Sequence, residues 1–242
     1  LSCINIMFHL IKSKIEIKHR SHFHSDHPLT TKNISPLMNY NFFSVIIGKS
    51  GSGKTSLLIN FLSDSKVYKR VFDKIILCIP EHSYKNMKNN IFEGLPKNQI
   101  KHELDFDELS EQISTYADED KQTLLIIDDF MAYLKVQRHL IQFNNLIQNR
   151  RHFRLSIFLL VQVYNSIPAM IRKSINSIFL FKCNKKEFQN IFEELFALSK
   201  QLALKIMKFV YTESHDFLLL DITNQLYYKN LDLILTNEDE ED

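Results

Sequence analysis

The feature that most constrains this chain is a cluster of glycines near its first quarter. Three of the four glycines in the chain lie there, in the run Gly-Lys-Ser-Gly-Ser-Gly-Lys-Thr from Gly48 to Thr55. The run matches the Walker A pattern G-x-x-x-x-G-K-[ST], in which backbone N–H groups turn inward around phosphate. Glycine permits this turn because it tolerates positive φ and close approach of other groups. The pattern predicts a site for the phosphates of a nucleotide.

The residues on either side of the loop support the same interpretation. Phe42–Ile47 is a short apolar run typical of a buried strand, and Ser56–Leu62 carries apolar residues at helical spacing. The loop therefore opens a helix, whose N-terminus favours phosphate. Lys54 is expected to reach the β- and γ-phosphates of ATP, and the Thr55 hydroxyl to be a ligand of Mg²⁺. The expected nucleotide contacts are Gly48, Lys49, Ser50, Gly51, Ser52, Gly53, Lys54 and Thr55.

A second motif follows at Leu124–Ile127, where four apolar residues precede Asp128 and Asp129. This is the Walker B arrangement, in which a buried strand carries a carboxylate to the sheet edge where α/β proteins bind ligands. Asp128 is expected to hold Mg²⁺, usually through water. Asp129 occupies the position that faces the attacking water in many ATP-hydrolysing motors. Because Asp129 is one methylene shorter than the usual glutamate, the assignment of the general base stays open.

Length and patterning place both motifs in one α/β domain. The 242 residues, 45% of them hydrophobic, allow one domain with a substantial core. No apolar run approaches the roughly 20 residues needed to span a bilayer. Short apolar runs alternate with helical patterns, which indicates strands covered on both faces. We expect a doubly wound, mostly parallel P-loop NTPase sheet with helices on both faces and a C-terminal hairpin. Its further strands are expected at Ile75–Ile79, Leu155–Val161 and Ser177–Phe181, its helices at Phe106–Tyr116, Val136–Arg150 and Phe188–Val210, and its hairpin at Phe217–Ile222 and Leu226–Tyr228.

The two ends of the chain differ from the domain expected at residues 41–235. Residues 1–40 are interpreted as a weakly ordered extension or an edge strand, the second because polar and apolar residues alternate from Lys14 onward within Ile11–Lys18. This segment also holds a histidine-rich cluster, interpreted as polar chain and not as a metal site, at His19, His22, His24, Asp26 and His27. The sequence begins at Leu1, which suggests a fragment or an upstream-extended reading frame, with Met38 a possible internal start. Residues 236–242 are expected to be a solvated acidic tail.

A third group of residues makes a more specific comparison possible. Arg151 and His152 lead into the strand that ends before Gln162, and the segment Ile-Pro-Ala-Met-Ile-Arg follows at 167–172. With the Walker motifs, these blocks resemble the genome-packaging ATPases of large DNA viruses, the poxvirus-like members of the FtsK–HerA superfamily. The similarity covers roughly residues 40–230, and virophages carry similar ATPases. The resemblance implies that Gln162 senses the γ-phosphate. It leaves the arginine finger open, with Arg151 and Arg172 as candidates and Arg150 and Arg138 behind them.

The resemblance also implies partners and a location. These are a homo-oligomeric ring, expected to be a hexamer, double-stranded DNA held by phosphate contacts, and proteins of the capsid vertex. The location implied is the host cytoplasm, in a virus factory, or the virion, and no signal peptide is expected. Two alternatives stay open, namely a plasmid-transfer or helicase-like ATPase and a nucleotide-gated assembly protein with little turnover. Hydrolysis of ATP with and without long duplex DNA separates the three.

Overall fold

The computed structural model describes residues 8–11, 35–38, 40–87 and 90–236. The expected histidine-rich cluster, most of the expected edge strand and the acidic tail from 237 onward lie outside these residues. Within them, ten strands form one sheet in the order β1-β10-β9-β8-β7-β2-β6-β5-β3-β4. The strands are β1 (Phe8–Ile11), β2 (Phe43–Ile47), β3 (Lys74–Cys78), β4 (Ile100–Lys101), β5 (Thr123–Asp128), β6 (Leu155–Val161), β7 (Ser177–Phe181), β8 (Phe217–Asp221), β9 (Leu226–Lys229) and β10 (Asp232–Thr236).

The sheet has a parallel part and an antiparallel part. Strands β7, β2, β6, β5, β3 and β4 are parallel neighbours. From β7 outward, β8, β9, β10 and β1 pair antiparallel. The predicted mostly parallel sheet is therefore confirmed. The predicted hairpin is too small, because β10 and β1 extend it, and the pairing of β1 with β10 joins the two ends of the chain.

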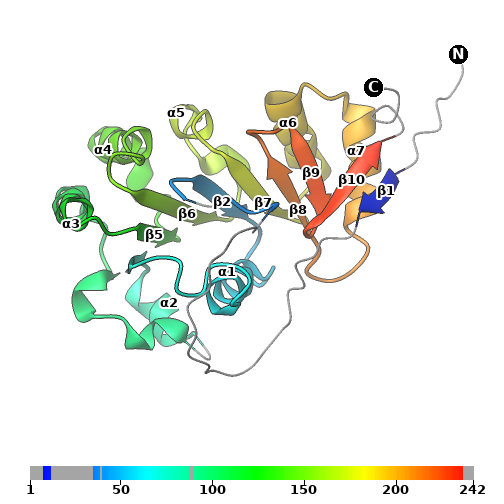
Figure 1. Cartoon of the computed structure of the whole chain (residues 1–242). Helices are drawn as coiled ribbons and strands as arrows, with labels where there is room; N and C mark the ends of the chain where they lie inside the picture. The colour runs from blue at the N-terminus through cyan, green and yellow to red at the C-terminus, as the bar shows by residue number, and fades with distance from the viewer. Residues whose placement is uncertain (1–7, 12–34, 39, 88–89, 237–242) are drawn as a thin grey trace, which may run out of the picture.

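Helices cover both faces of this sheet. Figure 1 shows α1 and α2 on one face and α3 to α7 on the other. A hydrophobic core lies on each face of the sheet, and side chains of β2 alternate between the two. Val45 and Ile47 belong to the core on the side of α3 to α7, and Ile46 belongs to the core on the side of α1. In the described residues, no helix is long and apolar enough to cross a membrane. The helices are α1 (Lys54–Ser63), α2 (Glu81–Lys85), α3 (Phe106–Asp118), α4 (Gln137–Gln148), α5 (Ala169–Arg172), α6 (Lys185–Phe196) and α7 (Lys200–Val210), with 3₁₀ turns η1 (Ile91–Gly94), η2 (Lys97–Gln99), η3 (Tyr133–Lys135) and η4 (Tyr164–Ser166).

The single helix predicted over Phe188–Val210 is wrong, because two helices occupy this segment. Helix α6 ends at Phe196, where Ala197 takes a left-handed conformation with φ of 52°. Helix α7 then starts after Ser199, whose hydroxyl accepts a hydrogen bond from the Leu202 N–H at 3.3 Å. The apolar spacing misled the prediction because both helices bury one face against the same sheet. Ser199 is a strong N-cap residue and was the available signal of the break.

Candidate active site

The glycine-rich loop joins β2 to α1 at the carboxyl edge of the parallel strands. Its start is tied to the neighbouring strand, since the Gly48 N–H donates to the Val161 carbonyl at 3.1 Å. Gly51 and Gly53 have φ of 75° and 109°, values that favour glycine. Gly53 is the N-cap of α1 and supplies no side-chain cap, so the first N–H groups of the helix are not satisfied by a capping side chain. Such N–H groups are suited to binding phosphate.

Close packing explains why the first residue of the loop is glycine. A Cβ atom at Gly48 would lie 2.9 Å from the Cβ of Phe181, the last residue of β7, and would collide with the Ser52 hydroxyl. A larger residue would therefore displace either the loop or β7. The packing therefore supplies a physical reason for glycine at the first position of the pattern.

Lys54 lies across the loop that it follows. Its ammonium group donates to the Gly48 carbonyl at 2.7 Å and to the Lys49 carbonyl at 3.1 Å. Burial lowers the pKa of Lys54, and the carboxylates of Asp128 and Asp129 act in the opposite direction. Both carboxylates therefore lie close enough to Lys54 to act on its charge.

The strand register brings the acidic pair and Gln162 to the same edge. Ile47 of β2 pairs with Val161 of β6, and Leu160 of β6 pairs with Asp128 of β5. Gln162, which is exposed, therefore follows directly after the residue that binds the start of the loop. Strand β6 lies between the strands that carry the two Walker motifs.

The two aspartates have different surroundings. Burial raises the pKa of Asp128 to about 6, although Lys54 partly offsets the effect. Asp129 is exposed and has φ of 62°, so the chain turns sharply directly after the strand. This turn presents the Asp129 carboxylate to solvent, where a water molecule can reach it.

The donor set at this edge suits Mg²⁺ held together with a nucleotide. The Thr55 hydroxyl and the Asp128 carboxylate offer hard oxygen donors at the same edge of the sheet. In the part of the chain that the structure describes, no group of three or more His, Cys, Asp or Glu residues could hold a metal ion. Mg²⁺ commonly takes only one or two protein oxygens and completes its shell with phosphate and water. The residues present fit that arrangement.

Arg151 lies where the parallel strands begin, opposite the carboxyl edge that carries the phosphate loop. It is exposed and stands four residues before β6 begins at Leu155. The seven residues of β6 separate this edge from Gln162 by about 20 Å at the usual rise per residue. The structure therefore does not bring Arg151 to the phosphate loop of its own chain.

The neighbouring Arg150 is fully engaged at that same edge. Its guanidinium donates to the Asn41 carbonyl at 2.8 Å, to the Ile147 carbonyl at 2.8 Å and to Asn176 Oδ1 at 3.2 Å. These bonds tie the end of α4 to the residues that precede β2 and β7. Arg150 therefore anchors the turn that presents Arg151.

Arg172 and Arg138 also bind within their own chain. Arg172 Nε donates to Glu194 at 3.0 Å, and its guanidinium carbon lies 5.0 Å from the centre of the Tyr164 ring. Arg138 forms an ion pair with Asp107 at 2.5 Å. Of the four finger candidates, Arg151 alone has no such contact among the described residues.

Sequence reasoning missed one contact at the loop. His215, in the turn between α7 and β8, donates its Nδ1–H to the Ser52 carbonyl at 2.9 Å. Its ring also lies beside Gly53, where an added Cβ would be 3.3 Å from Nδ1. No local pattern marks His215, because the two partners are 163 residues apart.

Comparison with known proteins identifies the family. The family described as "Poxvirus A32 protein" matches residues 31–242. The chain belongs to this family. The DNA packaging protein OPG160 of variola virus is 30% identical over 168 residues, which cover 66% of this chain and 60% of the relative. The chain thus spans about three fifths of the length of the curated relatives it matches. The A32 match confirms the predicted resemblance to poxvirus-like proteins.

Solved structures show the same fold. The DNA-packaging ATPase B204 from Sulfolobus turreted icosahedral virus superposes with a TM-score of 0.58 at 21% identity, over 80% of this chain and 98% of B204. The genome-packaging NTPase B204 of Sulfolobus turreted icosahedral virus 2, in complex with ATPγS, gives a TM-score of 0.57 at 20% identity. This match again covers 80% of this chain and 98% of B204. The predicted fold class is therefore confirmed.

Proposed function

We propose that this A32-family chain is an ATP-hydrolysing motor that packages viral double-stranded DNA into a capsid. The proposal rests on the position of Lys54, Asp128 and Gln162 at one edge of the sheet. They lie beside a phosphate loop in which two glycines take positive φ. The name of the variola relative and the fold shared with B204 support DNA packaging as the task.

Each residue at the edge has a distinct role in this proposal. Backbone N–H groups of the loop bind the phosphates, and Lys54 leaves its two carbonyl partners to reach the β- and γ-phosphates. Asp129 accepts a proton from the attacking water, and Gln162 orients that water. Thr55 and Asp128 would hold Mg²⁺, which neutralises charge on the β- and γ-phosphates when it is bound.

The proposed mechanism uses an arginine finger, and within one subunit the described residues place neither Arg151 nor Arg172 at the phosphate loop. An arginine finger contributes about 10³–10⁵ in rate to related reactions. Arg172 is held by Glu194, and Arg151 lies at the far edge of the sheet. We therefore infer a ring, expected to be a hexamer, in which Arg151 of one subunit serves the ATP site of the next.

The remaining parts of the proposal concern partners and place. We expect DNA to be bound through phosphates, with affinity that falls steeply as salt rises, because nothing in the sequence marks a base-reading element. We expect the ring to dock on capsid vertex proteins. These contacts would occur in the host cytoplasm, in a virus factory, or in the virion.

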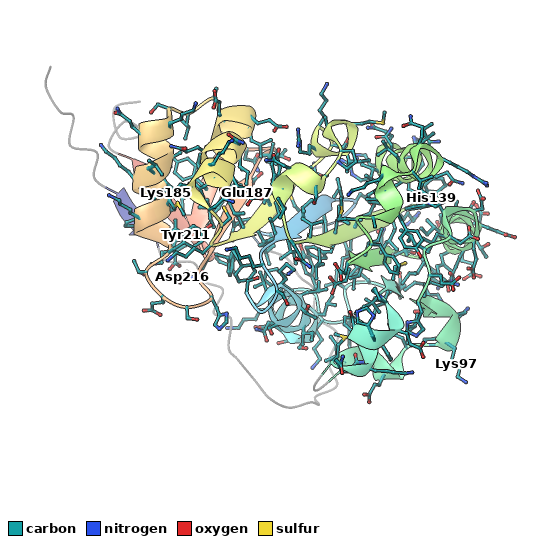
Figure 2. The ribbon with its side chains drawn as sticks, turned by 180° about the vertical axis from the view of Figure 1, so that it is seen from behind. Lys97, His139, Lys185, Glu187, Tyr211 and Asp216 are labelled. Carbon is teal, nitrogen blue, oxygen red and sulfur yellow. The ribbon has the colours of Figure 1, made fainter. Side chains whose placement is uncertain are left out.

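ATP hydrolysis with and without long duplex DNA tests the proposal. We expect hydrolysis that duplex DNA stimulates, and no turnover by Lys54→Ala. Lys97→Ala is the matched control and should keep full activity. Lys97, labelled in Figure 2, is exposed on η2, which leads into β4 at the end of the sheet, four strands from β2. Hydrolysis that ignores DNA would favour a helicase-like or transfer ATPase, and binding without turnover would favour an assembly protein. Wild-type turnover by Lys54→Ala would overturn the site itself.

A further inference from the structure

A cavity of about 410 Å³ opens beside the phosphate loop, on the side of β7 and β8. One wall is formed by Gly53, the N-cap of α1, and by Ser56, Leu57 and Asn60 of the helix. Ser56, Leu57 and Asn60 follow helical spacing, so their side chains lie on one face of α1. The opposite wall comes from Phe181, residues 214–217 and the turn at 230–232. The volume lies in the range of sites that bind small molecules.

The order of the strands indicates on which side of the loop the nucleoside of a bound nucleotide would lie. Asp128 and Gln162 lie toward β6 and β5 on one side of β2, whereas the cavity lies toward β7 and β8 on the other. In a loop of this kind the lysine reaches the β- and γ-phosphates. The γ-phosphate therefore points toward Asp128, and the nucleoside leaves the loop on the side of the cavity.

The fold itself already uses two of the polar groups in the far wall. Asp216 accepts hydrogen bonds from the N–H groups of Thr212 and Glu213, and Asn230 bonds both Phe217 N–H and Asp216. Figure 2 shows Asp216 in the loop that follows Tyr211 at the end of α7. These bonds fix the conformation of the wall and leave Asp216 and Asn230 few hydrogen-bonding positions for a ligand.

Asn60 is different, because its carboxamide lines the cavity and has no hydrogen-bond partner among the described residues. It lies seven residues beyond Gly53, about 10 Å along the axis of α1. A carboxamide presents a donor and an acceptor side by side. This pair matches the N7 acceptor and N6 donor of adenine, whereas guanine presents two acceptors, O6 and N7, on the same edge.

We propose that this cavity binds the nucleoside half of the nucleotide and that Asn60 selects adenine through its carboxamide. The inference rests on the proposed nucleotide site and adds its base specificity. Phe181, Phe217 and Leu231 supply apolar surface for the base. His215, fixed by Ser52, closes the end next to Gly53.

Calorimetric titration with ATP and with GTP, each in the presence of Mg²⁺, tests the assignment. We expect the wild-type protein to bind ATP about tenfold more tightly than GTP, the discrimination of one bidentate pair. Asn60→Leu should bring the ATP-to-GTP ratio close to one, mainly by weakening ATP. The matched control is Asn145→Leu, the same change at an exposed position of α4, which should keep the wild-type ratio.

The results that would refute the role of Asn60 differ from those that would refute the nucleotide site. A wild-type ratio near one, or an Asn60→Leu ratio equal to that of the wild type, would refute the role of Asn60. Both nucleotides are measured on the same preparation, so a partly unfolded variant does not change the ratio. Failure of the wild-type protein to bind ATP, or binding unchanged in Lys54→Ala, would instead refute the proposed nucleotide site.

Discussion

Replacing Asp128 by asparagine should stabilise the protein when nucleotide and metal are absent. Asp128 carries its carboxylate into a half-buried position, where Lys54 is the compensating cation among the described residues. The cost of burying that charge raises the pKa from 3.8 to about 6. Asparagine has nearly the same shape and no charge to bury. A residue with a proposed role in the reaction is therefore expected to reduce the stability of the protein without nucleotide and metal.

The pKa shift gives the size and the sign of the effect. One pKa unit corresponds to 1.36 kcal/mol, so the shift at Asp128 corresponds to about 3 kcal/mol. The folded protein binds this proton more tightly than the unfolded chain does. The stabilisation by the proton is complete below the unfolded pKa and is lost as pH rises through about 6. Asp128→Asn should therefore gain up to about 3 kcal/mol at pH 8 and well below 1 kcal/mol near pH 4.

Urea unfolding in EDTA at pH 4, 6 and 8 measures this difference. Glu111→Gln makes the same carboxyl-to-carboxamide change at an exposed position of α3 and should alter stability by less than about 0.5 kcal/mol at every pH. A variant less stable than the wild type at pH 8 would refute the reasoning. A gain of equal size at pH 4 and pH 8 would refute it as well, because charge burial predicts a gain that grows with pH.

Three further changes test the roles of single residues. Asp129→Asn should lower the rate of ATP hydrolysis by roughly two orders of magnitude while nucleotide binding survives, and an unchanged rate would move the base role elsewhere. Arg151→Ala and Lys54→Ala should each be inactive, yet mixing the two should restore hydrolysis at interfaces where an intact loop meets an intact Arg151. No recovery in confirmed mixed rings would count against Arg151. Arg172→Met should lower the free energy of unfolding by about 1–2 kcal/mol in urea and spare turnover, whereas lost turnover at unchanged stability would favour a finger role.

The parallel part of the fold could be predicted because its signals are local. Short apolar runs such as Leu155–Val161 and Ser177–Phe181 match the observed strands at both ends. The errors lie where distant segments meet or where two elements share one core. The partnership of β1 with β10 joins the two ends of the chain, and no local pattern predicts that pairing. The break at Ala197 was hidden because α6 and α7 bury their apolar residues against the same sheet.

The arrangement of the two Walker segments was predictable to a similar extent. The Walker motifs specify their own geometry, because each sits at the carboxyl end of a parallel strand. Spacing alone could not show that Arg172 is held by Glu194 or that Arg151 faces away from the site. The contact of His215 with Ser52 joins residues far apart in the sequence, so no local pattern could predict this wall of the cavity.

Strand β6 has a mechanical consequence that follows from its two ends. Its carboxyl end leads into Gln162, beside the proposed ATP site of its own subunit, and its amino end follows the turn that carries Arg151. The strand is hydrogen-bonded on both sides, to β2 and β5, and all seven of its residues are buried. Close-packed interiors of this kind are hardly compressible and transmit strain, so we expect a displacement at one end of β6 to reach the other. In a ring closed by Arg151, any shift of Gln162 at the γ-phosphate would also shift the arginine at the next subunit, so that successive hydrolysis events would be ordered around the ring without a separate signalling element.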